Sequence, residues 1–222
     1  MSLTFEIQDS VAHIQMDDGK ANALGFDMIA ALNEALDQGE AEAKAIIISG
    51  RPGRFSGGFD LSVMQHQPDK VGSLLNAGGH LLLRLFTSPR PVIAACSGHA
   101  LAAGGLMLLS ADTRIGIKGD FKIGLNETAI GMVLPIFGIE LPAARLSPLH
   151  FTPAVIQGNL YDPESAMEAG FLDKAVAPDD LIQTAFEAAG LLSGLPQHAY
   201  HGNKLLIRKP AIDAIKASLV PL

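Results

Sequence analysis

Cysteine, long hydrophobic runs and clustered positive charge are all scarce in this 222-residue chain. The single cysteine, Cys96, excludes an intramolecular disulfide and lies in an apolar run, where we expect a small buried side chain. No segment approaches the roughly 18 uninterrupted apolar residues of a membrane span, since serine, histidine and glycine break the longest candidate, 91–109. We therefore expect no membrane partner.

Acidic residues outnumber basic ones, 23 to 16, and the net charge is −7. No basic stripe is present, which argues against a nucleic-acid partner. Positive charges gather only at Lys204, Arg208 and Lys209, where we expect a solvated helix face and keep a phosphate contact as the alternative. The histidines lack metal-ligand spacing, so no metal or redox cofactor is expected. The acidic, alternating N-terminus does not resemble a targeting peptide, and we expect a cytoplasmic protein.

Strand-like and helix-like segments alternate along the chain, which predicts an α/β protein with one main domain. Asp27 is the expected cap of the first helix. The expected strands are 4–15 (two, around a turn), 45–48, 91–96, 113–118, 121–123 and 175–176. The expected helices are 27–37, 72–86, 103–111, 161–170, 179–192 and the tail from 196. Segments 45–48 and 91–96 are apolar throughout, which indicates burial on both faces of a parallel sheet.

Two glycine-rich segments about forty residues apart carry the clearest functional signal: Phe55–Leu61, the first loop, and Gly98–Leu106, the second loop. A strand, a tight turn and a helix around the second loop would place unpaired helix N-terminal amides at the turn, where they suit an oxygen gaining negative charge. A corner built only for close packing is the alternative. Neither segment has the spacing of a phosphate P-loop or a dinucleotide fingerprint. Asp60 is expected to cap the following segment rather than to catalyse.

Glu127 is the carboxylate of interest, in a segment of apolar and small residues from 123 to 133. A surface position is the ordinary expectation for a glutamate. These neighbours instead favour a dry pocket, in which desolvation would raise the pKa of the carboxyl and make it a better base. An oxyanion grip beside a single carboxylate suggests enolate chemistry.

Residues Arg51–Leu61 and Ser97–Gly105 resemble the two oxyanion loops of the crotonase superfamily, also called the enoyl-CoA hydratase/isomerase family. Residues 111–114 and 162–176 resemble later segments of that family, and the likeness runs from about residue 4 to 190. The resemblance implies a crotonase-like ββα spiral core over 1–195 and a shortened C-terminal helical segment over 196–222. It also implies an acyl-CoA thioester substrate with no separate cofactor, and a homotrimer or hexamer.

Carried over by position, the resemblance implies that the backbone N–H groups of Phe59 and Ala103 form the oxyanion hole. Glu127 would be the catalytic carboxylate. Leu106 stands where the family's hydratases have a second glutamate, and 123–128 resembles the Δ3-Δ2-enoyl-CoA isomerases. The implied activity is therefore the shift of a double bond from 3-enoyl-CoA to 2-enoyl-CoA. The substrate-contacting positions implied are Ser56, Gly57, Gly58, Asp60, Leu61, Gly104 and Leu106.

Three other functions stay open. One is an enoyl-CoA hydratase that works with a single carboxylate, and another is a non-catalytic acyl-CoA-binding homologue. The third is a serine hydrolase using Ser56 or Ser97 with His80 or His99, although no Gly-x-Ser-x-Gly elbow is present. Ala103 replaces a usual glycine and would be strained at positive φ. The short tail leaves the lid of the pocket and the oligomer open.

Overall fold

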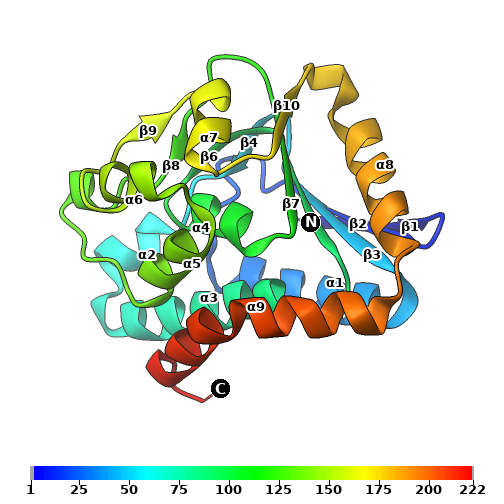
Figure 1. Ribbon diagram of the computed structural model, residues 1–222. Helices are drawn as coiled ribbons and strands as arrows, with labels where there is room; N and C mark the ends of the chain where they lie inside the picture. The colour runs from blue at the N-terminus through cyan, green and yellow to red at the C-terminus, as the bar shows by residue number, and fades with distance from the viewer. Residues whose placement is uncertain (1–2, 222) are drawn as a thin grey trace.

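Two β-sheets organise residues 3–221, the part of the chain that the computed structural model describes (Figure 1). The larger has the order β1-β2-β3-β5-β7-β10, with β1 antiparallel to β2 and the other neighbours parallel. Its strands are β1 (Leu3–Gln8), β2 (Val11–Met16), β3 (Ala45–Ser49), β5 (Val92–Cys96), β7 (Thr113–Ile117) and β10 (Lys174–Val176). Asp9 and Ser10 have φ of 51° and 64°, so β1 and β2 form the expected tight hairpin.

Helices cover both faces of this sheet, as the apolar strand segments predicted. Every residue of β3 and β5 is buried. Helix α8 (Leu181–Ser193) packs on one face, against alternate residues such as Ile47, Ile93 and Ile115. The helices on the other face are α1 (Phe26–Glu42), α3 (Pro68–Thr87) and α4 (Ala103–Ser110). The predicted α/β class is thus the observed architecture.

The smaller sheet has the order β4-β6-β8-β9, with β4, β6 and β8 parallel and β9 antiparallel to β8. Its strands are β4 (Gly53–Ser56), β6 (Gly98–Leu101), β8 (Ile123–Gly124) and β9 (Leu160–Tyr161). The sequence predicted loops over 55–61 and 98–106, but strands β4 and β6 take up the first residues of both. They pair because their backbones approach closely: a β-carbon on Gly98 would lie 2.1 Å from the carbonyl carbon of Gly53. Such a contact leaves no pattern in local sequence.

The remaining helices are α2 (Leu61–His66), α5 (Phe137–Arg145), α6 (Pro148–Val155), α7 (Pro163–Ala169) and α9 (Gln197–Ser218). The sequence indicated α7, which ends at Gly170 in the left-handed region, and α9, but not α5 or α6. Pro142 and Pro153 lie inside α5 and α6 and obscured them. Asp27 was wrongly expected to cap α1, whose N-cap is Gly25. No helix within 3–221 is long and apolar enough to cross a membrane.

The basic cluster on α9 is not the solvated face that we expected. The side chains of Lys204 and Arg208 are only 4% and 9% exposed, and both contact Asp112 at the end of α4. Lys209 alone points outward, paired with Asp213 one turn later. The prediction failed because α9 packs against α3 and α5, and that packing turns two of the three cations inward.

Candidate active site

Three short parallel strands bring the candidate site together. The carboxyl ends of β4, β6 and β8 lie at the same edge of the smaller sheet, and each is followed at once by a segment singled out in the sequence (Figure 1). Strand β4 leads to Phe59, β6 to Ala103, and β8 to Glu127. Ligands in α/β proteins bind at such strand ends, because the loops there converge. Residues about 70 positions apart in the chain therefore share one site.

Asn22 holds the first loop in place, and sequence reasoning missed it. Its side-chain amide donates to the carbonyl oxygens of Met16 and Phe55 at 3.0 and 3.2 Å. The main-chain carbonyl oxygen of Asn22 accepts from Ser56 Oγ at 2.8 Å, and Ser56 Oγ in turn accepts from the Gly58 N–H at 3.2 Å. Asn22 is fully buried with φ of 51°. The only signal in the sequence was an asparagine flanked by two alanines.

Gly58 sets the distance between the two glycine-rich loops. Its φ is 93°, and a β-carbon there would lie 2.8 Å from the methyl group of Ala102 and 3.1 Å from the Ala103 nitrogen. Gly104 approaches just as closely, since a β-carbon there would meet the Ser56 carbonyl oxygen at 2.3 Å. The two loops are thus in backbone contact, and glycine is required for it.

The N–H groups of Phe59 and Ala103 are left without an acceptor among residues 3–221. Leu24 donates to the Gly58 oxygen at 2.8 Å and accepts from the Asp60 N–H at 3.3 Å. These flanking bonds turn the Phe59 N–H to the opposite side. Ala103 is the first residue of α4, whose first amides have no partner within the helix. Two free donors beside a helix N-terminus suit an oxygen that gains negative charge.

Backbone strain lies at Ala102 and not at Ala103, the position at which the sequence suggested a positive φ. Ala102 has φ of 51° and ψ of −123°, which L-residues rarely adopt, and its N–H donates to the Gly124 oxygen at 2.9 Å. That bond ties the second loop to β8. The strained turn thus aims the next amide, that of Ala103, away from the sheet.

Glu127 is buried, as its apolar neighbours suggested, with 7% of its surface exposed. Its Oε2 atom is buried and has no hydrogen-bond partner in the described chain. Desolvation raises the pKa of this carboxyl above its ordinary value. The main-chain oxygen of Glu127 accepts from Ile130 and Met132, at 3.1 and 2.9 Å, which fixes the turn that carries the side chain.

An aromatic wall stands beside the first loop. The Phe59 ring lies directly on α3 at Gly78, where a β-carbon would come within 2.2 Å of its Cε1. The ring also meets Phe137 edge-on, with centroids 6.4 Å apart. Phe137 and Leu219 pack in the same way against Gly79. The Gly78-Gly79 pair is thus the surface of α3 that receives these side chains.

The other implied contact residues fall into two groups. Ser56 and Leu106 are fully buried, and Asp60 caps α2 by accepting from the Ser62 N–H at 2.8 Å. Gly57 lies against Ala21, and Leu61 is 52% exposed at the start of α2. Gly57 and Leu61 are exposed, whereas Ser56, Asp60 and Leu106 support the loops and the core.

A model of the enoyl-CoA hydratase/isomerase family matches residues 6–215. The chain belongs to this family. A crystal structure of an enoyl-CoA hydratase/isomerase family protein from Pseudomonas syringae is 42% identical, with a TM-score of 0.95 over 98% of this chain and 94% of that one. An enoyl-CoA hydratase from Mycobacterium marinum is 38% identical, with a TM-score of 0.93 over 98% and 96% of the two chains. The human mitochondrial enoyl-CoA delta isomerase 1 is 29% identical over 90% of this chain and 68% of its own.

The alternative function as a serine hydrolase has no geometric support in this structure. Ser56 Oγ donates to Asn22, and Ser97 Oγ donates to the Arg54 carbonyl. His80 contacts the Val220 carbonyl oxygen and His99 accepts from the Lys122 N–H, so neither histidine pairs with Ser56 or Ser97. Burial raises the pKa of the Cys96 thiol to about 12, which makes it a poor nucleophile.

Proposed function

We propose that this protein is an enoyl-CoA isomerase that uses Glu127 as its only proton shuttle. The observation that carries the proposal is a buried carboxylate with an unpaired oxygen, at the same sheet edge as two unpaired amides. Leu106, at the position of the hydratases' second glutamate, is apolar and buried. Adding water needs one group to activate it and usually a second to manage the proton, whereas moving a double bond needs one base that returns its proton.

The reaction would run as follows. Glu127 removes a proton from C2 of a 3-enoyl-CoA, and the negative charge moves onto the thioester oxygen. The N–H groups of Phe59 and Ala103 hold that oxygen, each contributing about 3 kcal/mol in the transition state, as in other oxyanion holes. The protonated Glu127 then delivers the proton to C4, which gives the conjugated 2-enoyl-CoA. Coenzyme A enters only as part of the substrate.

A paired assay tests the proposal. Purified protein is given 3-hexenoyl-CoA, with gain of the conjugated thioester absorbance as readout, and crotonyl-CoA, with its loss as readout. We expect gain with the first and no change with the second. Glu127→Gln should abolish turnover and keep acyl-CoA binding, whereas Glu168→Gln, which alters an exposed glutamate of α7, should keep both turnover and binding. Full activity in Glu127→Gln would end the proposal.

The second candidate is hydration, favoured by the similarity to the enoyl-CoA hydratase from Mycobacterium marinum. Loss of the crotonyl-CoA absorbance would establish it. Silence with both substrates, in a protein shown to bind acyl-CoA, would favour the non-catalytic homologue. The trimer or hexamer and the cytoplasmic location stay predictions, and the human relative is a mitochondrial protein.

A further inference from the structure

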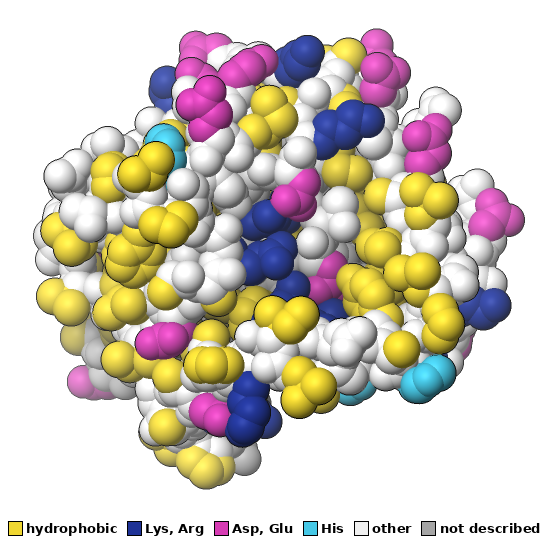
Figure 2. All heavy atoms as spheres, in the orientation of Figure 1, with side chains coloured by type: hydrophobic (Ala, Val, Ile, Leu, Met, Phe, Trp, Pro, Cys, Tyr) yellow, Lys and Arg dark blue, Asp and Glu magenta, His cyan; other side chains and the backbone are white. Residues whose placement is uncertain are grey.

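A hollow between α5 and α9 lies apart from the residues proposed for catalysis. It includes a cavity of about 310 Å³ lined by Glu140, Arg145, Ile207, Arg208 and Pro210 among others. A second cavity of about 290 Å³ shares Arg145, Ile207 and Arg208 with it. Figure 2 shows lysine and arginine side chains gathered in a hollow near the middle of this face. We call the two cavities together the α5–α9 pocket.

Positive charge exceeds negative charge around the inner part of this pocket. Arg114, Arg145, Lys204 and Arg208 are the cations, and the paired carboxylates are Asp112 and Asp173. Asp112 forms ion pairs with both Lys204, at 2.6 Å, and Arg208, at 2.9 Å. Asp173 accepts from Arg114 Nε at 3.0 Å. Two carboxylates therefore pair with three of the four cations.

Arg145 is the cation without a carboxylate partner among residues 3–221. One terminal nitrogen donates to the carbonyl oxygens of Ala111 and Asp112, at 3.0 and 3.2 Å. Its Nε is buried and has no acceptor within the described part of the chain. Burial, and then the nearby Arg114 and Arg208, lower the pKa of this guanidinium to about 10. A buried charge among like charges with an unused donor is costly, and an added anion would relieve it.

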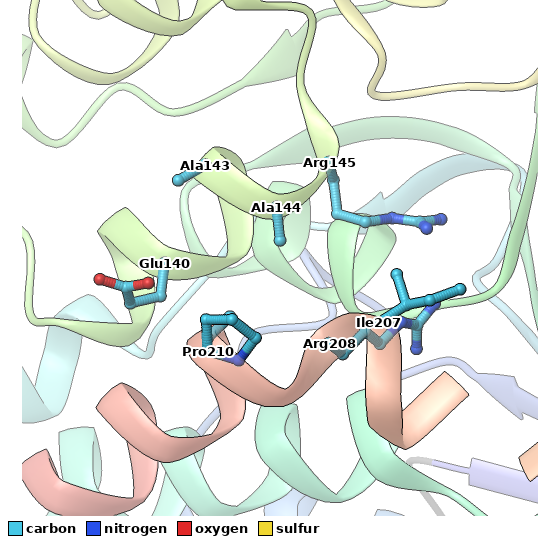
Figure 3. A pocket seen from close by; sticks show the side chains of 8 residues that line it. Glu140, Ala143, Ala144, Arg145, Ile207, Arg208 and Pro210 are labelled. Atoms are coloured by element: carbon cyan, nitrogen blue, oxygen red, sulfur yellow. The ribbon is translucent and has the colours of Figure 1, made fainter. Parts of the chain in front are cut away.

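The two arginines are placed to act together. Figure 3 shows Arg145, at the end of α5, and Arg208, on α9, extending their guanidinium groups to the same side of the pocket. Glu140 stands at the other end of α5 and directs its carboxylate away from them. Planar guanidinium forks bind oxyanions through paired hydrogen bonds. Tyr200, Asn203 and Asp112 line the second cavity, and the Asn203 side-chain amide can supply a further donor. The Tyr200 hydroxyl is engaged with Asp112, and burial followed by that carboxylate raises the pKa of the phenol.

We propose that the α5–α9 pocket binds a phosphate-type oxyanion, inorganic phosphate or a phosphomonoester, between Arg145 and Arg208. Such an anion would occupy a site distinct from the one proposed for acyl-CoA. It would also join α5 to α9. Phe137 at the other end of α5 packs on Phe59, so the ligand would stabilise a helix that supports the candidate active site. Ligand binding to the folded state alone raises its stability by mass action.

Calorimetric titration with inorganic phosphate, in chloride buffer at constant ionic strength, tests this directly. We expect saturable binding of one phosphate per chain in the parent protein. Arg145→Gln should weaken it at least tenfold, the loss expected for a charge-assisted contact. Lys216→Gln removes an exposed charge from α9 away from the pocket and should leave binding unchanged.

A second variant guards against misfolding of the first. Ile207 lines both cavities and is 82% exposed, so Ile207→Glu should place a competing carboxylate at the pocket without disturbing the core. It should abolish phosphate binding and keep the parent melting temperature. Absence of saturable heat in the parent, or equal binding in all variants, overturns the proposal. No binding together with a change of oligomeric mass in Arg145→Gln also overturns it, and assigns the pocket to a carboxylate of a second copy.

Discussion

Gly58 and Ala102, on different glycine-rich loops, are in contact so close that Gly58 has no room for a side chain. A β-carbon on Gly58 would lie 2.8 Å from the methyl carbon of Ala102. This contact sets the separation of the next two residues, Phe59 and Ala103, whose free amides form the candidate oxyanion hole. The geometry of the candidate site therefore depends on Gly58 and Ala102, neither of which has a functional group in its side chain.

Gly58→Ala tests that dependence. The substitution adds both the clash and the strain of φ at 93°, so we expect a loss of about 3 kcal/mol in the free energy of unfolding. Displaced amides should lower kcat about 100-fold. Gly19→Ala is the matched control, because Gly19 has φ of 73° with open space around it. It should lose about 1 kcal/mol and no activity. Equal behaviour of the two variants in urea unfolding and turnover would contradict the role of the contact.

Ala102→Gly should stabilise the protein, which is unusual for a buried turn. Relief of the strained backbone outweighs the entropy that glycine adds to the unfolded chain, and we expect a net gain of about 1 kcal/mol. Ala103→Gly, one residue later at a helical position, should instead lose up to about 1 kcal/mol. Urea unfolding of both variants checks the pair. A loss in Ala102→Gly would place the strain elsewhere.

Gly78→Ala should disturb catalysis from a helix that contributes no reacting group. Its β-carbon would displace the Phe59 ring and with it the Phe59 amide, so we expect kcat/KM to fall about 100-fold. Gly72→Ala lies in the same helix with nothing within 4 Å, and should gain about 1 kcal/mol of stability at unchanged kcat/KM. Unchanged kinetics in Gly78→Ala would show that the ring can move without the amide.

The pH dependence of Glu127 follows from its raised pKa. The proposed reaction requires the base form, so kcat/KM should rise with pH through an inflection above the ordinary glutamate value of 4.5. The folded state binds this proton more tightly than the unfolded state does. The free energy of unfolding attributable to Glu127 therefore falls as pH rises from the ordinary to the raised pKa.

The sign of that effect gives a second readout. Glu127→Gln should be more stable than the parent at pH 7, where the parent holds a buried, unpaired carboxylate. The difference should disappear below pH 4, where the carboxyl is protonated in both states. Melting temperatures of the two proteins across this range provide the measurement. A variant less stable than the parent at pH 7 would mean that Glu127 has a partner when folded.

Asp112→Asn should be among the most destabilising single changes in the chain. It leaves Lys204 and Arg208 buried without their shared carboxylate, and we expect a loss of about 3–5 kcal/mol. Asp213→Asn breaks the exposed ion pair with Lys209 on α9 and should lower the free energy of unfolding by about 0.5 kcal/mol or less. Chemical unfolding at neutral pH compares them, and similar losses would show that the Asp112 pairs are effectively solvated.

Local sequence by itself determined the parts of this protein that depend on neighbouring residues. The continuous apolar segments predicted β3 and β5, buried on both faces, and Gly170 predicted the end of α7. The apolar neighbours of Glu127 predicted its burial. The physical reason is that hydrophobic periodicity and glycine conformations are properties of a few consecutive residues.

Tertiary structure alone decided what depends on residues far apart in the chain. Parallel pairing of three strands placed Phe59, Ala103 and Glu127 at one sheet edge. The positive φ lies at Ala102, whose N–H is hydrogen-bonded to the Gly124 oxygen, and not at Ala103, where the sequence raised it. The packing of α9 buried Lys204 and Arg208 and left Arg145 without a carboxylate. Which face a helix buries, and which charge finds a partner, are set by contacts across the fold, and no local pattern of residues encodes them.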